Sequence, residues 1–210
     1  KKKTLLETYK KGVMKKIFNQ EIRFKDDNGK DFPDWEEKRL GDLFNFIRGS
    51  SLSKSDLDVD GEFKCIHYGE LFTTYKEVIR TIVSNTNKDG TRSIHGDILM
   101  PTSDVTPFGL ATASCIQEKD VILGGDMNIL RSKSNIEPVF FSYLLNFNVG
   151  SIIKLVTGTT IKHIYSKDLK PLRFNVPTDK TEQMRISEFF CSIDIQIELF
   201  QTQIDKSKTW

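Results

Sequence analysis

The feature that most constrains this chain is a regular spacing of apolar residues near its C-terminus. Over residues 181–208, apolar side chains recur at alternating steps of four and three. They are Ile186, Phe190, Ile193, Ile197, Phe200 and Ile204. This spacing predicts a narrow apolar seam along a helix of about 40 Å. We expect Asp179 to cap the helix and Glu182, which lies outside the seam, to complete a capping box while facing water.

A seam of this length needs a second long helix to cover it, and residues 3–18 supply one. Their apolar side chains fall at steps of three and four, on one face: Leu6, Tyr9, Val13 and Ile17. Gly12 weakens this helix by about 1 kcal/mol relative to Ala, so the helix needs packing to persist. The two sets of residues are therefore the predicted helix-packing interface. The alternative is that each terminal helix lies on the core of the domain between them.

Composition and charge narrow the class of protein. The 210 residues contain no run of 18 apolar residues that would span a membrane, and the basic start lacks the features of a signal peptide. The three cysteines are widely spaced without a CxxC pair, which favours a reducing, cytoplasmic setting over a zinc site or a disulfide framework. Residues 1–18 hold seven Lys and one Glu, whereas the remainder carries a net charge of −4. A nucleic-acid surface on the remainder must therefore be local.

Between the helices the sequence predicts an α+β domain with a mixed, many-stranded sheet and small helices. Strands are expected at 44–48, 65–68, 78–83, 98–100, 110–116, 121–123, 128–131 and 172–176. Helical segments are expected at 138–147, which begins with Pro138, and at 151–156, with one more turn at 167–169.

The sequence contains no complete motif for catalysis or metal binding. Residues 56–61 resemble the start of a calcium-binding loop, but His67 stands where a bidentate Glu is needed. A PD and ExK pattern in residues 33–38 is too compressed to bring carboxylates together around Mg²⁺. There is no nucleophile elbow, P-loop or dinucleotide-binding glycine pattern. We therefore expect no catalytic residues, no metal and no cofactor.

Four polar loops punctuated by glycine or proline remain: residues 48–54, 87–92, 101–107 and 157–163. Their Arg, Lys, Ser and Thr side chains are of the kind that donate to phosphates and base edges. Composition alone favours the alternative that they are ordinary surface loops.

The order of the segments resembles the specificity subunit of type I restriction-modification systems. LLETYKKGVMKKIF, residues 5–18, is similar to the end of that family's conserved spacer helix. FPDWEEKRLGDLF is similar to the entry of its target recognition domain, and GDILMPTSD, GGDMNILR and GTTIKHIYSKDLKPLRFNVP to landmarks within it. TEQMRISEFFCSIDIQIELF is similar to the start of the next spacer helix.

The resemblance implies a non-catalytic subunit that reads double-stranded DNA. A full subunit of this family has two recognition domains, each reading half of a split site. Its helices space the two halves and dock methyltransferase subunits, through which restriction subunits join. This chain matches half of that pattern: a spacer-helix end at 1–18, a recognition domain at 19–177 and the next helix at 178–210. Since one helix runs into the domain and the other runs out, we expect them to pack antiparallel. A second copy, or the other half of the subunit, is a further expected partner.

The residues expected at the DNA come from the four loops. They are Arg48, Lys54, Arg92, Thr102, Ser103, Thr106, Gly158, Thr159, Thr160, Lys162 and His163. Ile161 and Ile164 are expected to face the core and pin the last loop. The alternative for that loop is structural, with Gly158 as a helix C-cap and the threonines capping the next turn.

Overall fold

The computed structural model describes residues 1–133 and 135–208 and divides the chain into two compact units. The first contains residues 1–34 together with 177–210, and the second contains residues 35–176. Residues 19–34, assigned by sequence to the recognition domain, belong to the unit with the helices. Thr209 and Trp210, at the end of the expected second helix region, lie outside the described residues.

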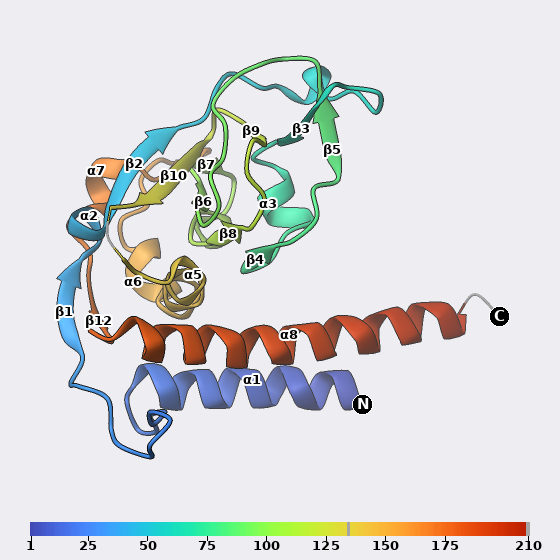
Figure 1. Cartoon of the computed structure of the whole chain (residues 1–210). Coiled ribbons are helices and arrows are strands. Elements are labelled where there is room, and N and C mark those ends of the chain that lie inside the picture. Colours follow the sequence, from blue (N-terminus) through green and yellow to red (C-terminus); the bar gives the residue numbers. More distant parts are fainter. Residues whose placement is uncertain (134, 209–210) are drawn as a thin grey trace. The chain divides into compact units, whose positions relative to one another are not determined.

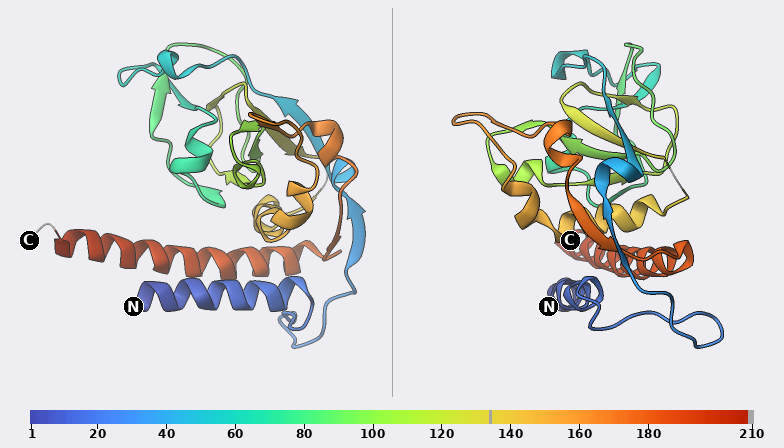
Figure 2. Two further views of the ribbon diagram at one scale, coloured as in Figure 1. Left: turned by 180° about the vertical axis from the view of Figure 1, so that it is seen from behind. Right: turned by 90° about the vertical axis from the view of Figure 1, so that its left-hand side faces the viewer.

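The first unit is built on two long helices, α1 (Lys2–Phe18) and α8 (Lys180–Lys208), which lie side by side in Figures 1 and 2. Lys3 donates to Gln201 over 2.7 Å at one end, and the rings of Phe18 and Phe190 lie 5.9 Å apart towards the other. Residue numbers therefore rise along one helix as they fall along its neighbour. The predicted antiparallel pair is confirmed.

The seam of α8 is buried along most of its length. Ile186, Phe190, Ile193 and Ile197 are at most 5% exposed, whereas Phe200 and Ile204 are half-buried. The burial of these apolar side chains stabilises the helix pair, because it removes their surface from water.

The matching face of α1 differs from the prediction at one position. Ile17 is buried and Leu6 and Val13 are half-buried, but Tyr9 is 53% exposed. Lys10 is buried in its place, and its ammonium lies 2.7 Å from the carboxylate of Asp194. The expectation for Tyr9 was wrong because its neighbour forms a cross-helix ion pair, which fixes the face of α1 that turns inward.

The start of α8 also differs. Asp179 caps the helix as predicted, since its carboxylate accepts from the backbone N–H of Thr181 at 2.7 Å. Glu182, however, is fully buried and does not face water. Its two oxygens accept from Nε and Nη2 of Arg23 at 3.0 and 2.8 Å, and this bidentate pair replaces the expected capping box.

The second unit contains four sheets and several short helices, so the α+β class with mixed strand directions is confirmed (Figure 1). The central sheet has the order β2 (Phe44–Arg48), β10 (Met127–Ser132), β6 (Ile98–Pro101), β8 (Ser114–Ile116) and β4 (Val78–Ile79). Its neighbours are antiparallel except β4 and β8. A second sheet has the order β5 (Ser84–Thr86), β3 (Phe63–Ile66) and β9 (Ile122–Leu123).

Two ribbons complete the strands. β1 (Glu36–Arg39) pairs antiparallel with β12 (Arg173–Val176), and β7 (Ser103–Asp104) pairs antiparallel with β11 (Lys162–His163). The helical segments are α2 (Leu40–Leu43), η1 (Lys54–Asp56), α3 (Glu70–Thr73), α4 (Pro107–Leu110), α5 (Pro138–Phe147), α6 (Val149–Ile153) and α7 (Ser166–Leu169). The strand expected at 110–116 was wrong at its start, because Leu110 ends α4.

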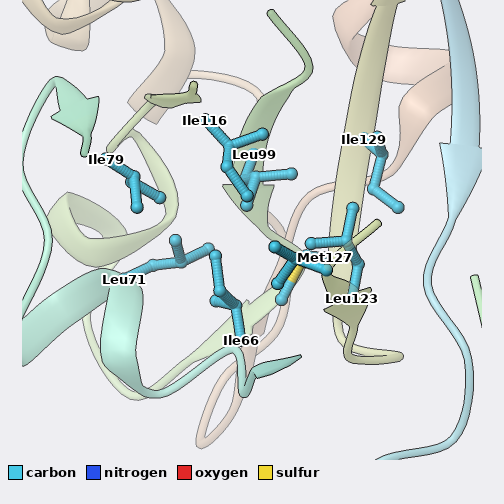
Figure 3. Close-up of a cluster of buried hydrophobic side chains, with 9 residues drawn as sticks. Ile66, Leu71, Ile79, Leu99, Ile116, Leu123, Met127 and Ile129 are labelled. Carbon is cyan, nitrogen blue, oxygen red and sulfur yellow. The ribbon is translucent and has the colours of Figure 1, made fainter. Parts of the chain in front are cut away.

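The core of this unit lies between the two larger sheets (Figure 3). Leu99, Ile116 and Ile129 from the central sheet meet Ile66 and Leu123 from the three-stranded sheet, and all five are completely buried. The shared core holds the two sheets in one body. The ends of their strands, and the loops that follow them, are therefore fixed relative to each other.

Candidate nucleic-acid interface

Two of the four loops with predicted DNA-contacting residues, 48–54 and 101–107, begin at the same end of the central sheet. The last residue of β2, Arg48, is the register partner of Asn128 in β10. The last residue of β6, Pro101, is the partner of Met127, the first residue of β10. The segments after β2, after β6 and before β10 therefore emerge next to one another.

Residues 48–54 and 87–92 form the first loop group. The hydroxyl of Thr91 donates to the carbonyl of Arg48 at 3.2 Å. The backbone N–H of Thr91 donates to the hydroxyl of Ser50 at 3.1 Å. These bonds join two loops that are distant in sequence.

The cationic side chains of this group differ in whether they already have a hydrogen-bond partner. Arg48 and Lys54 are exposed, with no hydrogen bond from their side chains to the described residues. The guanidinium of Arg92 instead donates to Asp89 at 2.8 Å and lies 4.9 Å above the ring of Phe63. Arg48 is thus free to reach a ligand directly, whereas Arg92 must first leave Asp89.

Asp56 anchors the end of the first loop group. Its carboxylate accepts from the hydroxyl and N–H of Ser53 at 2.6 and 2.7 Å and lies 2.9 Å from the ammonium of Lys88. The Ser53 hydroxyl and then the Lys88 ammonium lower the pKa of Asp56 to about 2. Asp56 is therefore a charged structural tie between the two loops, which accounts for its place in the calcium-like sequence pattern.

Residues 101–107 and 157–163 form the second loop group, joined by the β7–β11 ribbon. The hydroxyl of Ser103 and Nδ1 of His163 lie 2.9 Å apart. The N–H of Ile164 donates to the carbonyl of Thr102 at 3.1 Å. Thr106 also serves structure here, since its hydroxyl accepts from Gly109 N–H at the start of α4.

The segment 157–163 is a hairpin rather than a helix end. Thr157 and His163 exchange two backbone hydrogen bonds, and Gly158 has a φ of +101°. A Cβ on Gly158 would lie 2.2 Å from the carbonyl oxygen of Ile161, so glycine is required. The alternative of a helix C-cap is wrong because α6 ends at Ile153. In the right view of Figure 2, this orange hairpin between α6 and α7 extends away from the sheets.

Some side chains of the hairpin are exposed to solvent, whereas others bond to the hairpin backbone. Thr159 and Thr160 are exposed, and the ammonium of Lys162 donates to the carbonyls of Gly158 and Thr159 at 2.7 Å. Ile164 is buried as expected. Ile161 is 53% exposed, so the expectation that it faces the core was wrong: the hairpin projects it outward.

The segment 124–126 connects the two loop groups. A Cβ on Gly125 would lie 3.1 Å from the carbonyl oxygen of Ser50 in the first group. The carbonyl of Asp126 accepts from the N–H of Thr102 in the second group at 2.9 Å. Sequence patterns indicated only a turn in this segment. Its position between the two groups is set by pairings remote in sequence, and no local signal indicated it.

A cavity of about 440 Å³ lies beside this junction. Its lining comes from the second loop group, from Asp126 and from the segment around α3: Tyr68, Gly69, Phe72, Ser103, Asp104, Val105, Asp126, Ile161 and His163. Of the predicted residues, only Ser103 and His163 line the cavity. The structure thus adds an aromatic wall that the sequence patterns did not indicate.

Chemically, the arrangement favours binding. The Ser103–His163 pair has the types of side chain found in nucleophilic catalysis, but the ring of His163 has no carboxylate partner among the described residues. No group of three potential metal-ligating side chains occurs in residues 1–133 and 135–208. Within the same residues, no helix is long and apolar enough to span a membrane.

Comparison with known proteins gives a consistent result. The family model described as "Type I restriction modification DNA specificity domain" matches residues 33–207. The "Putative type I restriction enzyme MjaX specificity subunit" of Methanocaldococcus jannaschii is 30% identical, over 97% of this chain and 49% of the relative. The chain therefore spans about half the length of this relative.

Two solved structures share the fold. The first has the description "Structural basis underlying complex assembly and conformational transition of the type I R-M system". Its TM-score is 0.68 at 18% identity, and the match covers 99% of this chain and 48% of the related chain. The HsdS subunit from Thermoanaerobacter tengcongensis has a TM-score of 0.63 at 19% identity and covers 96% and 46%. Because the family model matches most of the residues, this chain belongs to the family of type I restriction-modification DNA specificity domains.

Proposed function

We propose that residues 35–176 read one half of a bipartite double-stranded DNA site, without catalysis, in a cytoplasmic type I restriction-modification complex. The four loops predicted as DNA contacts form two hydrogen-bonded groups, and one loop of each group leaves the same end of the central sheet; this observation carries the proposal. The loops offer exposed hydroxyls, Arg48 and Lys54 on a part of the chain that is otherwise not strongly basic. Membership of the specificity-domain family supports the same function.

The helices α1 and α8 complete the proposal. We assign to them the docking of methyltransferase subunits, through which restriction subunits join the complex. They also space this recognition unit from a second one, supplied by another copy or by the other half of a full subunit. The structural relative with a TM-score of 0.68 comes from work on complex assembly of the type I R-M system, which supports such docking.

The test is to map methylated sites in cells that carry this subunit together with its methyltransferase. We expect a defined half-site that changes when the loops of residues 35–176 are exchanged for those of a relative. A base-substitution binding series with the assembled complex provides the second measurement. Equal binding to every sequence would instead favour a pure assembly module whose globular unit never reads DNA.

Absence of catalysis is tested with the purified chain alone. It is incubated with DNA, Mg²⁺ and S-adenosylmethionine, and both strand cleavage and methyl transfer are measured. We expect neither, since the described residues include no metal-ligating cluster and no complete nucleophilic triad. Either activity from the chain alone would overturn the binding-subunit proposal.

A further inference from the structure

The cavity beside residues 124–126 has a charge character that sets it apart from the surrounding loops. Two of its lining residues are carboxylates, Asp104 and Asp126, and none is Lys or Arg. Carboxylates repel a phosphate and accept from an N–H donor. The cavity therefore suits a ligand group with hydrogen-bond donors, while the cations outside it suit the DNA backbone.

The two carboxylates are not equivalent. Asp104 already accepts from the N–H of Val105 at 2.7 Å and from the hydroxyl of Thr106 at 2.6 Å, so it stabilises its own loop. The carboxylate of Asp126 is exposed and accepts no hydrogen bond within residues 1–133 and 135–208. Its backbone is nevertheless fixed, because its carbonyl accepts from Thr102 N–H at 2.9 Å. Asp126 thus presents an unused acceptor from a backbone held in place directly before β10.

The other walls are apolar. The rings of Tyr68 and Phe72 stand edge to face with centroids 6.2 Å apart. Val105 and Ile161, which come from the two loops of the second group, are 72% and 53% exposed. Exposed apolar side chains gathered around a cavity indicate a ligand with an apolar surface. In the major groove, apolar side chains contact the C5 position of a pyrimidine, which is a methyl group in thymine and a C–H in cytosine.

We propose that this cavity holds the major-groove edge of a cytosine, because its exocyclic amino group is the major-groove donor that Asp and Glu side chains read. The amino N–H donates to the carboxylate of Asp126, and Val105 and Ile161 pack against the apolar C5 side of the same base pair. Asp126 is then a specificity-determining residue of the recognition unit. This inference rests on the proposed DNA-reading function and names the base class that one position of the half-site requires.

The first experiment selects preferred sites from randomised DNA with the full complex, for the wild-type chain and for D126A. We expect the wild-type consensus to contain one position restricted to a G·C pair, with its cytosine on a fixed strand. In D126A that position should lose about tenfold of its preference, while all other positions stay unchanged. The control is D42N, which removes a charge from α2 beyond the opposite end of β2 and should leave the consensus unaltered.

The second experiment removes the amino group from the DNA. At the selected position, cytosine is replaced by 2-pyrimidinone. Loss of the amino group should weaken binding by the wild-type chain about tenfold and leave binding by D126A unchanged. D126N, which keeps the shape of the side chain, covers the case in which D126A fails to fold; circular dichroism checks each variant.

The outcomes separate the inference from the function on which it rests. A wild-type complex with no sequence preference overturns both. A wild-type consensus that persists at every position in D126A and D126N overturns only the role of Asp126. A tenfold loss on removal of the amino group that is equal in wild type and variants also overturns it, because the amino group would then contact another residue.

Discussion

Lys162 illustrates how a single side chain can serve both the fold and a ligand. Its ammonium holds the carbonyls of Gly158 and Thr159, at the surface of the hairpin. If it also contacts a phosphate, K162A should weaken binding to all DNA sequences alike and reduce the slope of log K against log salt by about one. The control is K119A, an exposed lysine on the turn after β8. An unchanged salt slope, with the fold intact, would remove Lys162 from the contacts.

The arginines of the first loop group make a different prediction. R48A should lower affinity mainly for the preferred site, by about 1–3 kcal/mol if the guanidinium is bidentate to a guanine. R92A should have a smaller net effect, because Arg92 gives up its bond to Asp89 when it turns to DNA. Binding series on single-base variants of the site measure both effects. Unaltered base preference in both variants would exclude them as base readers.

Asp56 predicts a pH dependence at the residue scale. Its folded-state pKa of about 2 lies below the ordinary value of 3.8. Its contribution to stability is therefore complete above pH 4 and is lost as the pH falls towards 2. S53A should raise the pKa of Asp56 more than K88M does, since the Ser53 hydroxyl is the larger cause. NMR titration of the Asp56 carboxyl carbon measures both; a midpoint that neither change moves would contradict the assignment.

At the scale of elements, the Lys10–Asp194 pair is expected to fix the register of α1 against α8. Both side chains are about one-tenth exposed, so removing one leaves a nearly buried charge. K10M or D194L alone should lower the free energy of unfolding by about 3 kcal/mol. The double substitution should recover most of that loss. Thermal unfolding of the four chains measures the coupling, and additive losses would show that the pair does not act as a unit.

The same scale shows which parts of the fold the sequence predicts. The helix at 138–147 is predictable because Pro138 starts it and most of its other residues are apolar, and the structure has the same bounds. The strand β1 is not predictable in this way, because its residues, EEKR, have low strand propensity and it forms only through its pairing with β12. Helices of four residues such as α3 and α4 also escape prediction, since local turn geometry decides them.

The candidate site divides in a similar way. The polar loops stand out in sequence because glycine and hydroxyl residues separate apolar strands. Their grouping into pairs, and the cavity that combines Tyr68 with Asp126 and His163, depend on strand pairing over long separations in sequence. Tyr9 and Lys10 show the same limit for a helix. The spacing of apolar residues predicts which face of α1 is buried, but the ion pair of Lys10 with Asp194 on α8 turns a neighbouring face inward.

At the scale of the whole molecule, two compact units divide the proposed work between them. The unit of α1 and α8 is stabilised by buried apolar residues and by two ion pairs, Lys10–Asp194 and Arg23–Glu182. The other unit has its own core between two sheets. Substitutions such as I193D with I197D should therefore abolish co-purification with methyltransferase subunits, because they place charges in the buried seam of α8. Retained co-purification would count against docking through these helices.

The β1–β12 ribbon affects how the gene segment for the second unit can be exchanged. Glu36 and Val176 are register partners, so the chain enters and leaves the second unit through neighbouring strands about 5 Å apart. A gene segment for residues 36–176 therefore encodes an exchangeable cassette with adjacent ends. Its replacement by the corresponding segment of a relative should give a folded chimera with unaltered helices and the donor's DNA preference. If residues 35–176 read DNA as proposed, one recombination event between relatives changes the sequence that is read, whereas a single substitution alters one loop contact at a time.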